Sequence, residues 1–432
     1  MSSKDVLLYF GTEEAKVTAG QDSDCQVNLK KDCQIYNISA DARELKTACE
    51  SDGNAYIFMG EDSSVSTNQA TPENNCQLTN ITSGTKIIRG NGGKLEQSTD
   101  DNKTLKTEGG QIKLFNVTGS STILEINNLT FTASSTVGTT STLDGALICV
   151  DDGATVILKQ CYINGMSMSN QGISLIYVKS GGTLLLENCT FYNNTSTNKG
   201  AVSFSECIRI ENGAQVEVVS CNFESNGDGD LMSNAAAIEN SGSCRISNTT
   251  FKGNKANRGS AIMNNDTGIL EIEDSTFDSN TCTSNGGYYA RRGGAIFIQG
   301  GSVKITDSTF TGNKAGGYNP GNEGTTNGEF QKLGGGAISI KTGSLVLQNT
   351  KFDNNSVTST STDDANGYGG AVLIEQSDAN LFLKDASGAA MDIASYINKY
   401  MSGNTTAKTN AGANIYCNGG TINGTVYTKA WE

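Results

Sequence analysis

The sequence predicts an all-β protein built as a right-handed parallel β-helix, a solenoid with three sheets. Three observations support this prediction. A unit of about thirty residues recurs along the chain. Each unit holds three short apolar runs that alternate with polar residues. The 432 residues include 51 glycines but only two prolines, which suits a chain that turns often and still donates its N–H groups along strands.

The repeat is clearest at a Gly-Ala step that is followed by a short apolar run, as in residues 293–298 and 335–340. A second motif, Phe-x-x-Asn, follows at the equivalent place in each repeat. Its six copies begin at Phe191, Phe223, Phe251, Phe277, Phe310 and Phe352. Successive coils of a parallel β-helix pair about 4.8 Å apart, so equivalent residues stack on one another. We therefore expect the phenylalanines to form one internal column.

Small side chains stand two residues before each Phe position, and three of them are Cys161, Cys189 and Cys221. They share the inward phase of the phenylalanines, so we expect a buried ladder of small side chains with inert thiols. The Asn of Phe-x-x-Asn is expected to adopt a left-handed turn conformation and to bond the backbone at a corner. None of the 12 cysteines forms a CxxC pair, so a zinc site is not expected.

Charge and composition exclude several classes of function. The net charge of −14 argues against nucleic acid as a partner, because phosphate binding needs clustered Lys and Arg. The chain has no histidine, which removes the usual general base and the commonest zinc ligand. No stretch reaches the ~20 apolar residues of a transmembrane segment. The apolar stretch within residues 1–20 is too short for a signal peptide.

The pairing of Gly-Gly-Ala-Ile with Phe-x-x-Asn resembles the repeat of the polymorphic outer membrane protein family. The resemblance covers roughly residues 140–375 and is tightest over 235–356. It implies a β-helical passenger of a surface adhesin, and therefore an extracellular or cell-surface location. The family usually carries a leader and a C-terminal β-barrel, and we expect neither here, which leaves the export route open. The whole chain is more loosely similar to pectin-lyase-like β-helices.

The two ends of the chain differ from the repeats. Residues 1–77 are expected to form a capping region with a short helix at 39–49, because the open end of a β-helix must be covered. Residues 78–388 are assigned to the β-helix repeats. Residues 389–432 are assigned to a C-terminal helix and a last coil, with apolar residues at helical spacing over 389–401.

Three links between a Phe and the next Gly-Ala step are unusually long, and they contain loops 281–292, 314–334 and 356–368. Because the coils stack, these loops are expected to leave the same edge and lie side by side. Aromatic and charged residues gathered on adjacent loops would form a binding surface for a glycan or a protein. The alternative is tolerated insertion without function. The candidate ligand-binding residues are Tyr288, Tyr289, Arg291, Arg292, Tyr318, Phe330 and Tyr368.

Catalysis is the alternative reading of the fold, because pectin-lyase-like enzymes use carboxylates, calcium, Arg or Lys. The pairs Asp151/Asp152 and Asp363/Asp364 have no matching acidic constellation on adjacent coils. Asp228 and Asp230 form a weak calcium candidate, against a simple solvated turn. We therefore assign no catalytic residue and expect no cofactor, with calcium as the one possibility.

The sequence thus predicts an extracellular or surface-exposed adhesin or structural protein that binds a glycan or a partner surface protein. The first alternative is a polysaccharide lyase or hydrolase. The second is a filament subunit that self-associates end to end through its caps.

Overall fold

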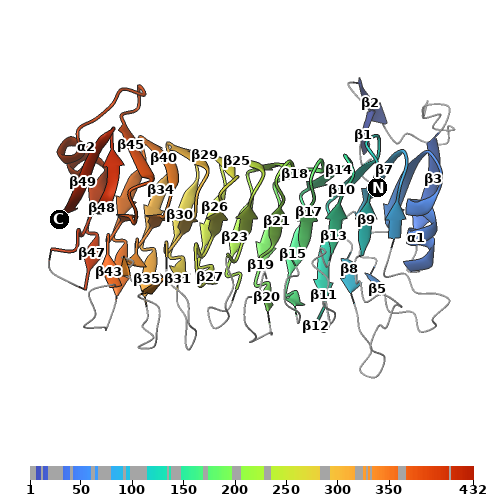
Figure 1. Ribbon diagram of the computed structural model, residues 1–432. Helices are drawn as coiled ribbons and strands as arrows, with labels where there is room; N and C mark the ends of the chain where they lie inside the picture. The colour runs from blue at the N-terminus through green and yellow to red at the C-terminus, as the bar shows by residue number, and fades with distance from the viewer. Residues whose placement is uncertain are drawn as a thin grey trace.

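The computed structural model describes residues 33–38, 42–59, 79–90, 114–133, 147–168, 174–196, 206–227, 235–282, 292–316, 333–358, 366–407 and 410–432. It also describes the short segments 6–10, 13–17, 64–66, 94–97, 136–137, 325–326 and 329–330. Within these residues the chain forms an elongated solenoid of parallel strands, with α1 (Ala42–Glu50) and α2 (Ile393–Tyr400) at opposite ends (Figure 1).

Three long parallel sheets run the length of the solenoid. The first sheet contains β6 (Thr79–Ile81), β9 (Phe115–Val117), β13 (Ile148–Val150), β17 (Ile176–Val178), β21 (Ile208–Ile210), β24 (Ile238–Asn240), β28 (Ile262–Asn264), β32 (Ile296–Ile298), β39 (Ile338–Ile340) and β44 (Val372–Ile374). The second contains β3 (Cys33–Ile38), β4 (Asn54–Met59), β7 (Thr85–Arg89), β10 (Ile123–Asn127), β14 (Thr155–Lys159), β18 (Thr183–Glu187), β22 (Gln215–Val219), β25 (Ser243–Ser247), β29 (Ile269–Glu273), β33 (Ser302–Thr306), β40 (Gly343–Gln348) and β45 (Ala379–Lys384).

The third sheet contains β5 (Ser64–Ser66), β8 (Lys94–Gln97), β11 (Thr130–Ala133), β15 (Tyr162–Asn164), β19 (Thr190–Tyr192), β23 (Asn222–Glu224), β26 (Thr250–Lys252), β30 (Thr276–Asp278), β34 (Thr309–Thr311), β41 (Lys351–Asp353) and β46 (Met401–Ser402). Each coil therefore passes once through three sheets, which confirms the predicted all-β solenoid. Parallel pairing begins at β3, so the second sheet extends into the region that the sequence assigns to the N-terminal cap.

Shorter strands complete the coils. The fourth sheet contains β27 (Lys255–Ala256), β31 (Thr281–Cys282), β35 (Lys314–Gly316), β42 (Ser356–Thr358) and β47 (Thr405–Thr406). A similar short sheet contains β12 (Thr136–Val137), β16 (Ser167–Met168) and β20 (Thr195–Ser196). Two antiparallel pairs are β1 (Val6–Phe10) with β2 (Glu13–Val17), and β36 (Thr325–Thr326) with β37 (Glu329–Phe330).

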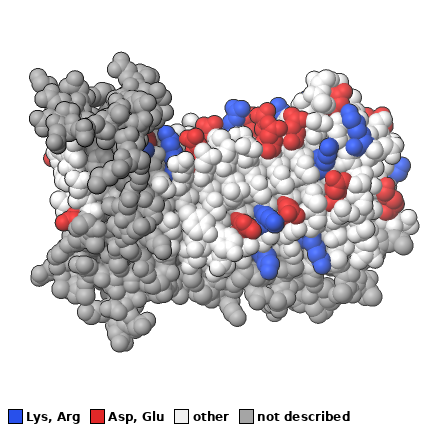
Figure 2. All heavy atoms as spheres, turned by 180° about the vertical axis from the view of Figure 1, so that it is seen from behind, with Lys and Arg blue, Asp and Glu red and all other residues white. Residues whose placement is uncertain are grey.

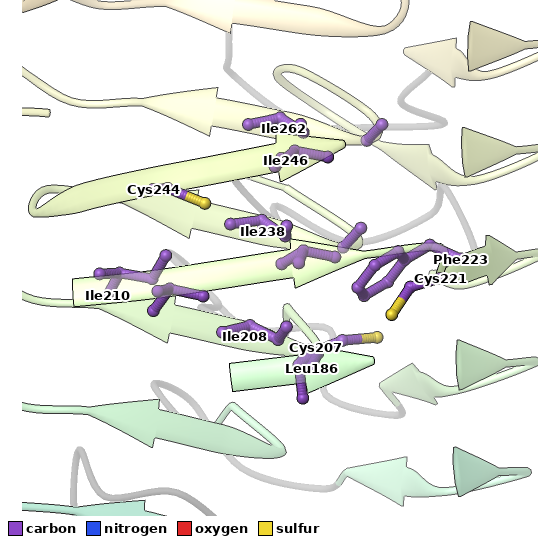
Figure 3. Close-up of a cluster of buried hydrophobic side chains, with 14 of the residues drawn as sticks. Leu186, Cys207, Ile208, Ile210, Cys221, Phe223, Ile238, Cys244, Ile246 and Ile262 are labelled. Carbon is purple, nitrogen blue, oxygen red and sulfur yellow. The ribbon is translucent and has the colours of Figure 1, made fainter. Parts of the chain in front are cut away.

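Strands form here because their apolar residues alternate with polar ones. In β22 the burial alternates along the strand, so that Val216 and Val218 are buried while Gln215 and Glu217 are exposed. The inward side chains of all three sheets form one continuous core that runs from Ile38 to Ile422. Figure 3 shows part of it, with Ile208, Ile238 and Ile262 from successive strands of the first sheet facing Phe223.

The six phenylalanines form the predicted column, and each of them is fully buried. Neighbouring ring centroids are 4.5–5.0 Å apart and the planes of adjacent rings differ by only 2–10°. This spacing follows from the parallel register, which pairs Phe251 with Phe277 and Phe277 with Phe310.

The asparagines of Phe-x-x-Asn form a buried ladder. The predicted left-handed conformation of these asparagines is wrong. The residue that takes the left-handed conformation is the one before this Asn, for example Ser225 at φ 57° and Ser279 at φ 56°. The Asn side chain instead points inward. Asn280 donates from Nδ2 to the carbonyl of Phe251 and to Oδ1 of Asn313, both at 2.9 Å. The predicted bond to the backbone is present, but it reaches the neighbouring coil.

The small side chains before the phenylalanines are buried, as predicted. Ser275 Oγ donates to the carbonyl of Glu273 at 2.7 Å and accepts from the N–H of Thr249 at 3.2 Å. The Cys221 thiol takes the same place, because its Sγ lies 3.3 Å from the carbonyl oxygen of Val219 and 3.3 Å from the amide nitrogen of Cys189. These thiols therefore act as members of a hydrogen-bonded column.

Burial of the core thiols predicts a loss of stability at alkaline pH. Removal from water raises the pKa of Cys244 from 9.0 to about 12. Between these values the native state binds more protons than the unfolded state, so the free energy of unfolding falls as the pH rises. For one such thiol we expect a loss on the order of 1 kcal/mol between pH 8 and pH 10. Urea unfolding at both pH values should show a smaller fall for Cys244→Ala than for the wild type, and an equal fall would contradict the expectation.

Both ends of the solenoid carry covering elements. Helix α1 buries Leu45, Ala48 and Cys49, in agreement with the predicted short helix. Helix α2 begins after Asp392, whose side chain accepts from the N–H of Ser395, and it buries Tyr396 and Tyr400. Strand β48 (Ile415–Ile422) pairs with β44 and β45 and forms an antiparallel hairpin with β49 (Thr425–Trp431).

On the face opposite to the one seen in Figure 1, acidic and basic side chains lie interspersed (Figure 2).

Candidate functional site

The three long loops have their ends on adjacent coils. Strands β31, β35 and β42 pair in parallel register within the fourth sheet, so the chain leaves this sheet at stacked positions. The return points are stacked as well: Arg292 forms parallel bridges with Arg258 and Gly334, and β38 (Leu333–Gly334) pairs with β43 (Asn366–Tyr368). We call this region the loop edge.

Glycine fixes the return of each loop to the first sheet. A Cβ atom on Gly294 would lie 1.9 Å from the carbonyl oxygen of Gly336, and one on Gly336 would lie 1.9 Å from that of Gly370. The main chains of adjacent coils therefore approach too closely here for any side chain. This contact explains the second glycine of the Gly-Gly-Ala segments.

Several predicted site residues lie outside the described residues, namely Tyr288, Tyr289, Arg291, Tyr318, Asp228 and Asp230. Phe330 lies in β37, whose backbone pairs with β36. The two other predicted binding residues, Arg292 and Tyr368, are described in full, and both are buried at the loop edge.

Arg292 is the centre of a buried polar cluster. Its Nε donates to Oε2 of Glu375 at 2.8 Å, and Ser339 donates its hydroxyl to Oε1 of the same carboxylate. The guanidinium carbon lies 5.5 Å from the ring centroid of Phe297. Arg292 thus crosses the outer face of the first sheet over three coils and holds the return point of loop 281–292 in place.

Tyr368 has a similar packing position. Its side chain is 8% exposed and its ring centroid lies 4.5 Å from that of Tyr416. Both rings pack on Leu373 and Ala411. A second apolar cluster of Ala235, Met263 and Phe297 covers the same face of the first sheet. The outer face of this sheet therefore carries two apolar clusters below the loop edge, and the polar cluster of Arg292, Ser339 and Glu375 lies between them.

A group that the sequence analysis did not single out surrounds Tyr177 on the first sheet. The Tyr177 hydroxyl donates to Oε1 of Glu211. The guanidinium of Arg209 and the ammonium of Lys179 lie 5.5 and 5.8 Å from the Tyr177 ring centroid. Lys179 also pairs with Asp151 at 3.4 Å. The sequence could have indicated this group, because Tyr177 and Arg209 occupy equivalent outward positions on successive coils and therefore become neighbours.

Acidic residues do not converge on a metal site in the part of the chain that the structure describes. No group of three His, Cys, Asp or Glu side chains there has the arrangement to hold an ion. The carboxylate of Asp151, one of the candidate acids, is engaged by Lys179, and Asp152 lies at the adjacent turn with φ 52°.

Comparison with known proteins supports the fold. Residues 113–297 match the family model described as a right-handed β-helix region. A search of curated proteins gave no match. Among the described residues, no helix has the length and apolar character needed to cross a membrane.

A search of solved structures gave matches that include three chains of low similarity. Tailspike protein 3 of bacteriophage CBA120 is 10% identical, with 90% of this chain and 56% of that chain covered and a TM-score of 0.40. This chain therefore spans little more than half of the tailspike. The L. reuteri 53608 SRRP is 14% identical, with 81% and 99% covered and a TM-score of 0.33. A PL6 alginate lyase in complex with a trisaccharide is 12% identical, with 91% and 97% covered and a TM-score of 0.38. The family model and the strand order together show that the chain folds as a right-handed parallel β-helix.

Proposed function

We propose that this chain is an extracellular or surface-exposed β-helical adhesin that binds a glycan or a partner surface protein through its side loops. The observation that carries this proposal is the stacking of the loop ends at the loop edge. Loops anchored on three consecutive coils start about 4.8 Å apart, so their side chains would form one surface. The resemblance to the polymorphic outer membrane protein repeat agrees with surface display.

The solenoid supplies the rigid support that such loops need. Each coil is fixed to the next by backbone pairing, by the phenylalanine column and by the asparagine ladder. The return points are held by Arg292 with Glu375 and by Tyr368 with Tyr416. These residues position the loops, so we assign any direct contact with a ligand to the loops themselves.

Shortened loops test the proposal. In the neighbouring coil, Asn257 alone joins β27 to Arg258, and Arg258 is in register with Arg292. Replacing residues 283–291 by one asparagine, and deleting 317–333 so that Gly316 precedes Gly334, therefore copies a native link. Binding on glycan and surface-protein arrays should be lost if the loops carry the site, while far-UV circular dichroism stays unchanged.

A matched control is needed for these two variants. Shortening the link between Phe223 and Ala237 to the length of the one between Phe251 and Ala261 changes a neighbouring coil and leaves the three loops intact. We expect this variant to bind as the wild type does. Undiminished binding by the chain with shortened loops would refute the site assignment.

The calcium proposal for Asp228 and Asp230 is tested separately. Calorimetric titration with calcium should give heat for the wild type and none for the double variant Asp228→Asn/Asp230→Asn. The absence of heat and of thermal stabilisation in the wild type would end this idea.

A polysaccharide lyase or hydrolase is the second candidate, and the group around Tyr177 is the observation that favours it. A phenol hydrogen-bonded to Glu211 and flanked by Arg209 and Lys179 contains the acid, base and cation types that sugar cleavage uses. Tyr177→Phe should then abolish the release of reducing or unsaturated ends from a polysaccharide panel. No release by the wild type would exclude this function.

End-to-end assembly is the third candidate. Ile35 on β3 is 52% exposed and Val426 on β49 is 67% exposed, so the terminal strand at each end of the solenoid carries an exposed apolar side chain. Sedimentation velocity should show chains that lengthen with concentration and that are lost in Val426→Ser. A monomer at all concentrations would exclude it.

A further inference from the structure

A groove of about 800 Å³ lies on the outer face of the second sheet, near its N-terminal end. Side chains of β3, β4, β7, β10, β14 and β18 line it, so it crosses six successive strands. Five steps between parallel strands of about 4.8 Å give it a length of roughly 24 Å along the solenoid axis. We call it the axial groove, and it lies on a different sheet from the loop edge.

The floor of the axial groove is aliphatic, which is unusual for an outward-facing position. Ile87, Ile123 and Ile157 all point outward and are only partly buried. Further along the column of Ile87 and Ile157, the outward residues become Glu217, Arg245 and Glu271, which are charged. The same column is apolar again at Leu185, next to Ile157, and at Val346 and Phe382 near the C-terminal end. The isoleucines of the groove therefore belong to one of two apolar stretches on this face.

The charges that line the axial groove cancel. They are two cations, Arg89 and Lys159, and two anions, Glu125 and Glu187. Glu125 lies between the cations, 3.8 Å from Arg89 and 3.9 Å from Lys159. These distances are long for charge-assisted hydrogen bonds. Oε1 of Glu125 accepts instead from Nδ2 of Asn127 at 2.9 Å, which leaves the charged groups of Arg89 and Lys159 at the groove surface without a close bond to this carboxylate.

The rim of the axial groove adds amide side chains. Gln160 and Asn188 occupy exposed corners with φ 53° and lie next to Lys159 and Glu187 in sequence. Amides offer both donors and acceptors. Tyr56, which is in register with Ile87, and Cys33 line the N-terminal end of the groove. The lining thus combines an apolar floor with mixed polar groups, and its charges cancel.

We propose that the axial groove binds an uncharged linear glycan that lies parallel to the solenoid axis. The apolar faces of the sugar rings would lie on Ile87, Ile123 and Ile157, and the hydroxyl groups, which both donate and accept, match the mixed polar lining. An acidic polysaccharide would meet Glu125 and Glu187 on a chain with a net charge of −14. A polymer fits because the groove presents equivalent positions at a regular interval along the axis.

Two matched pairs of variants test the proposal. Ile123 and Ile269 lie in one column of the second sheet, five coils apart, and so Ile123→Ser has Ile269→Ser as its control. Glu187 and Glu273 share another column, three coils apart, and so Glu187→Gln has Glu273→Gln as its control. All four side chains face outward, so we expect near-identical melting temperatures for all variants.

The experiment uses uncharged oligosaccharides of glucose, mannose and xylose, with uronic-acid oligosaccharides as the acidic comparison. We expect an uncharged probe to bind the wild-type chain, with little dependence on salt. Each groove variant should lose about tenfold in affinity or more, while each control binds as the wild type does. The chain with both side loops shortened should bind the same probe unchanged, which separates this site from the loop edge.

Several results would overturn the proposal. Preference for uronic-acid probes would show that the assigned ligand class is wrong. Equal losses in Ile123→Ser and Ile269→Ser would place the binding elsewhere. The absence of binding to every uncharged probe, or capture of an extended peptide by the groove in place of a glycan, would remove the site altogether.

Discussion

Replacement of Phe277 by alanine should lower the free energy of unfolding by about 3–5 kcal/mol. The ring is fully buried in the middle of the column, with centroids of Phe251 and Phe310 at 4.7 and 4.5 Å. Its loss would remove two stacking contacts and leave a void between rigid coils. Because the coils are held apart by backbone pairing, the neighbouring rings cannot move together to fill that void.

Urea unfolding monitored by far-UV circular dichroism measures this effect. Phe277→Leu should cost less than Phe277→Ala, because leucine fills part of the volume. Ile269→Ala is the matched control, since its side chain is 53% exposed on the outer face of a strand in the same coil, and it should change stability by no more than about 0.5 kcal/mol. A cost below about 1 kcal/mol for Phe277→Ala would mean that the column contributes little.

The phenylalanine column could be predicted from the sequence because it depends on register alone. Once equivalent residues of successive coils stack, the inward phase of a strand fixes which side chains meet. The same reasoning placed Cys161, Cys189 and Cys221 correctly in the core.

The conformation of the ladder asparagines could not be assigned in the same way. Asn favours left-handed corners in general, and the corner here has two adjacent candidates. The residue before the ladder Asn is in fact the left-handed one, and it is Asn193, Ser225, Gly253, Ser279, Gly312 or Asn354. This restriction to small, turn-forming residues was the available signal. The inward Asn is constant because its amide must both donate and accept.

The contacts of Arg292 and the axial groove could not be predicted from the sequence, because they join residues that are far apart along the chain. Glu375 follows Arg292 by 83 residues, and only the coil geometry brings the two together. The groove combines residues from six strands, and no short stretch of sequence contains them. Outward isoleucines at positions 87 and 157 were a weak indication, because the same column carries charged residues from Glu217 to Lys304.

The second large effect is expected for Asn280→Asp. At neutral pH this change should lower the free energy of unfolding by about 3–5 kcal/mol. The Oδ1 atom of Asn280 accepts from the N–H and from Nδ2 of Asn254, at 3.1 and 2.9 Å, and a carboxylate could still do so. The Nδ2 donor, however, would be replaced by an oxygen that faces the carbonyl of Phe251 and Oδ1 of Asn313. A buried negative charge would then face two acceptors.

The pH dependence of this variant separates lost hydrogen bonds from a general packing defect. In the native state, burial and the facing acceptors would raise the pKa of the introduced carboxyl above the ~3.9 of an unfolded chain. The native state then binds more protons than the unfolded state, so the variant loses stability as the pH rises and regains it as the pH falls. Protonation also restores one donor to the ladder.

Urea unfolding of Asn280→Asp and of the wild type at pH 5 and pH 8 is the measurement. The difference between them should be clearly smaller at pH 5. Asn248→Asp is the control, because Asn248 is exposed at a corner with φ 48° and its variant should follow the wild type at both pH values. A deficit that is equal at both pH values would show that the ladder amides do not bond as donors. Since the donor bonds of Asn254, Asn280 and Asn313 each reach the next coil, that result would leave the backbone pairing and the phenylalanine column to hold the coils together.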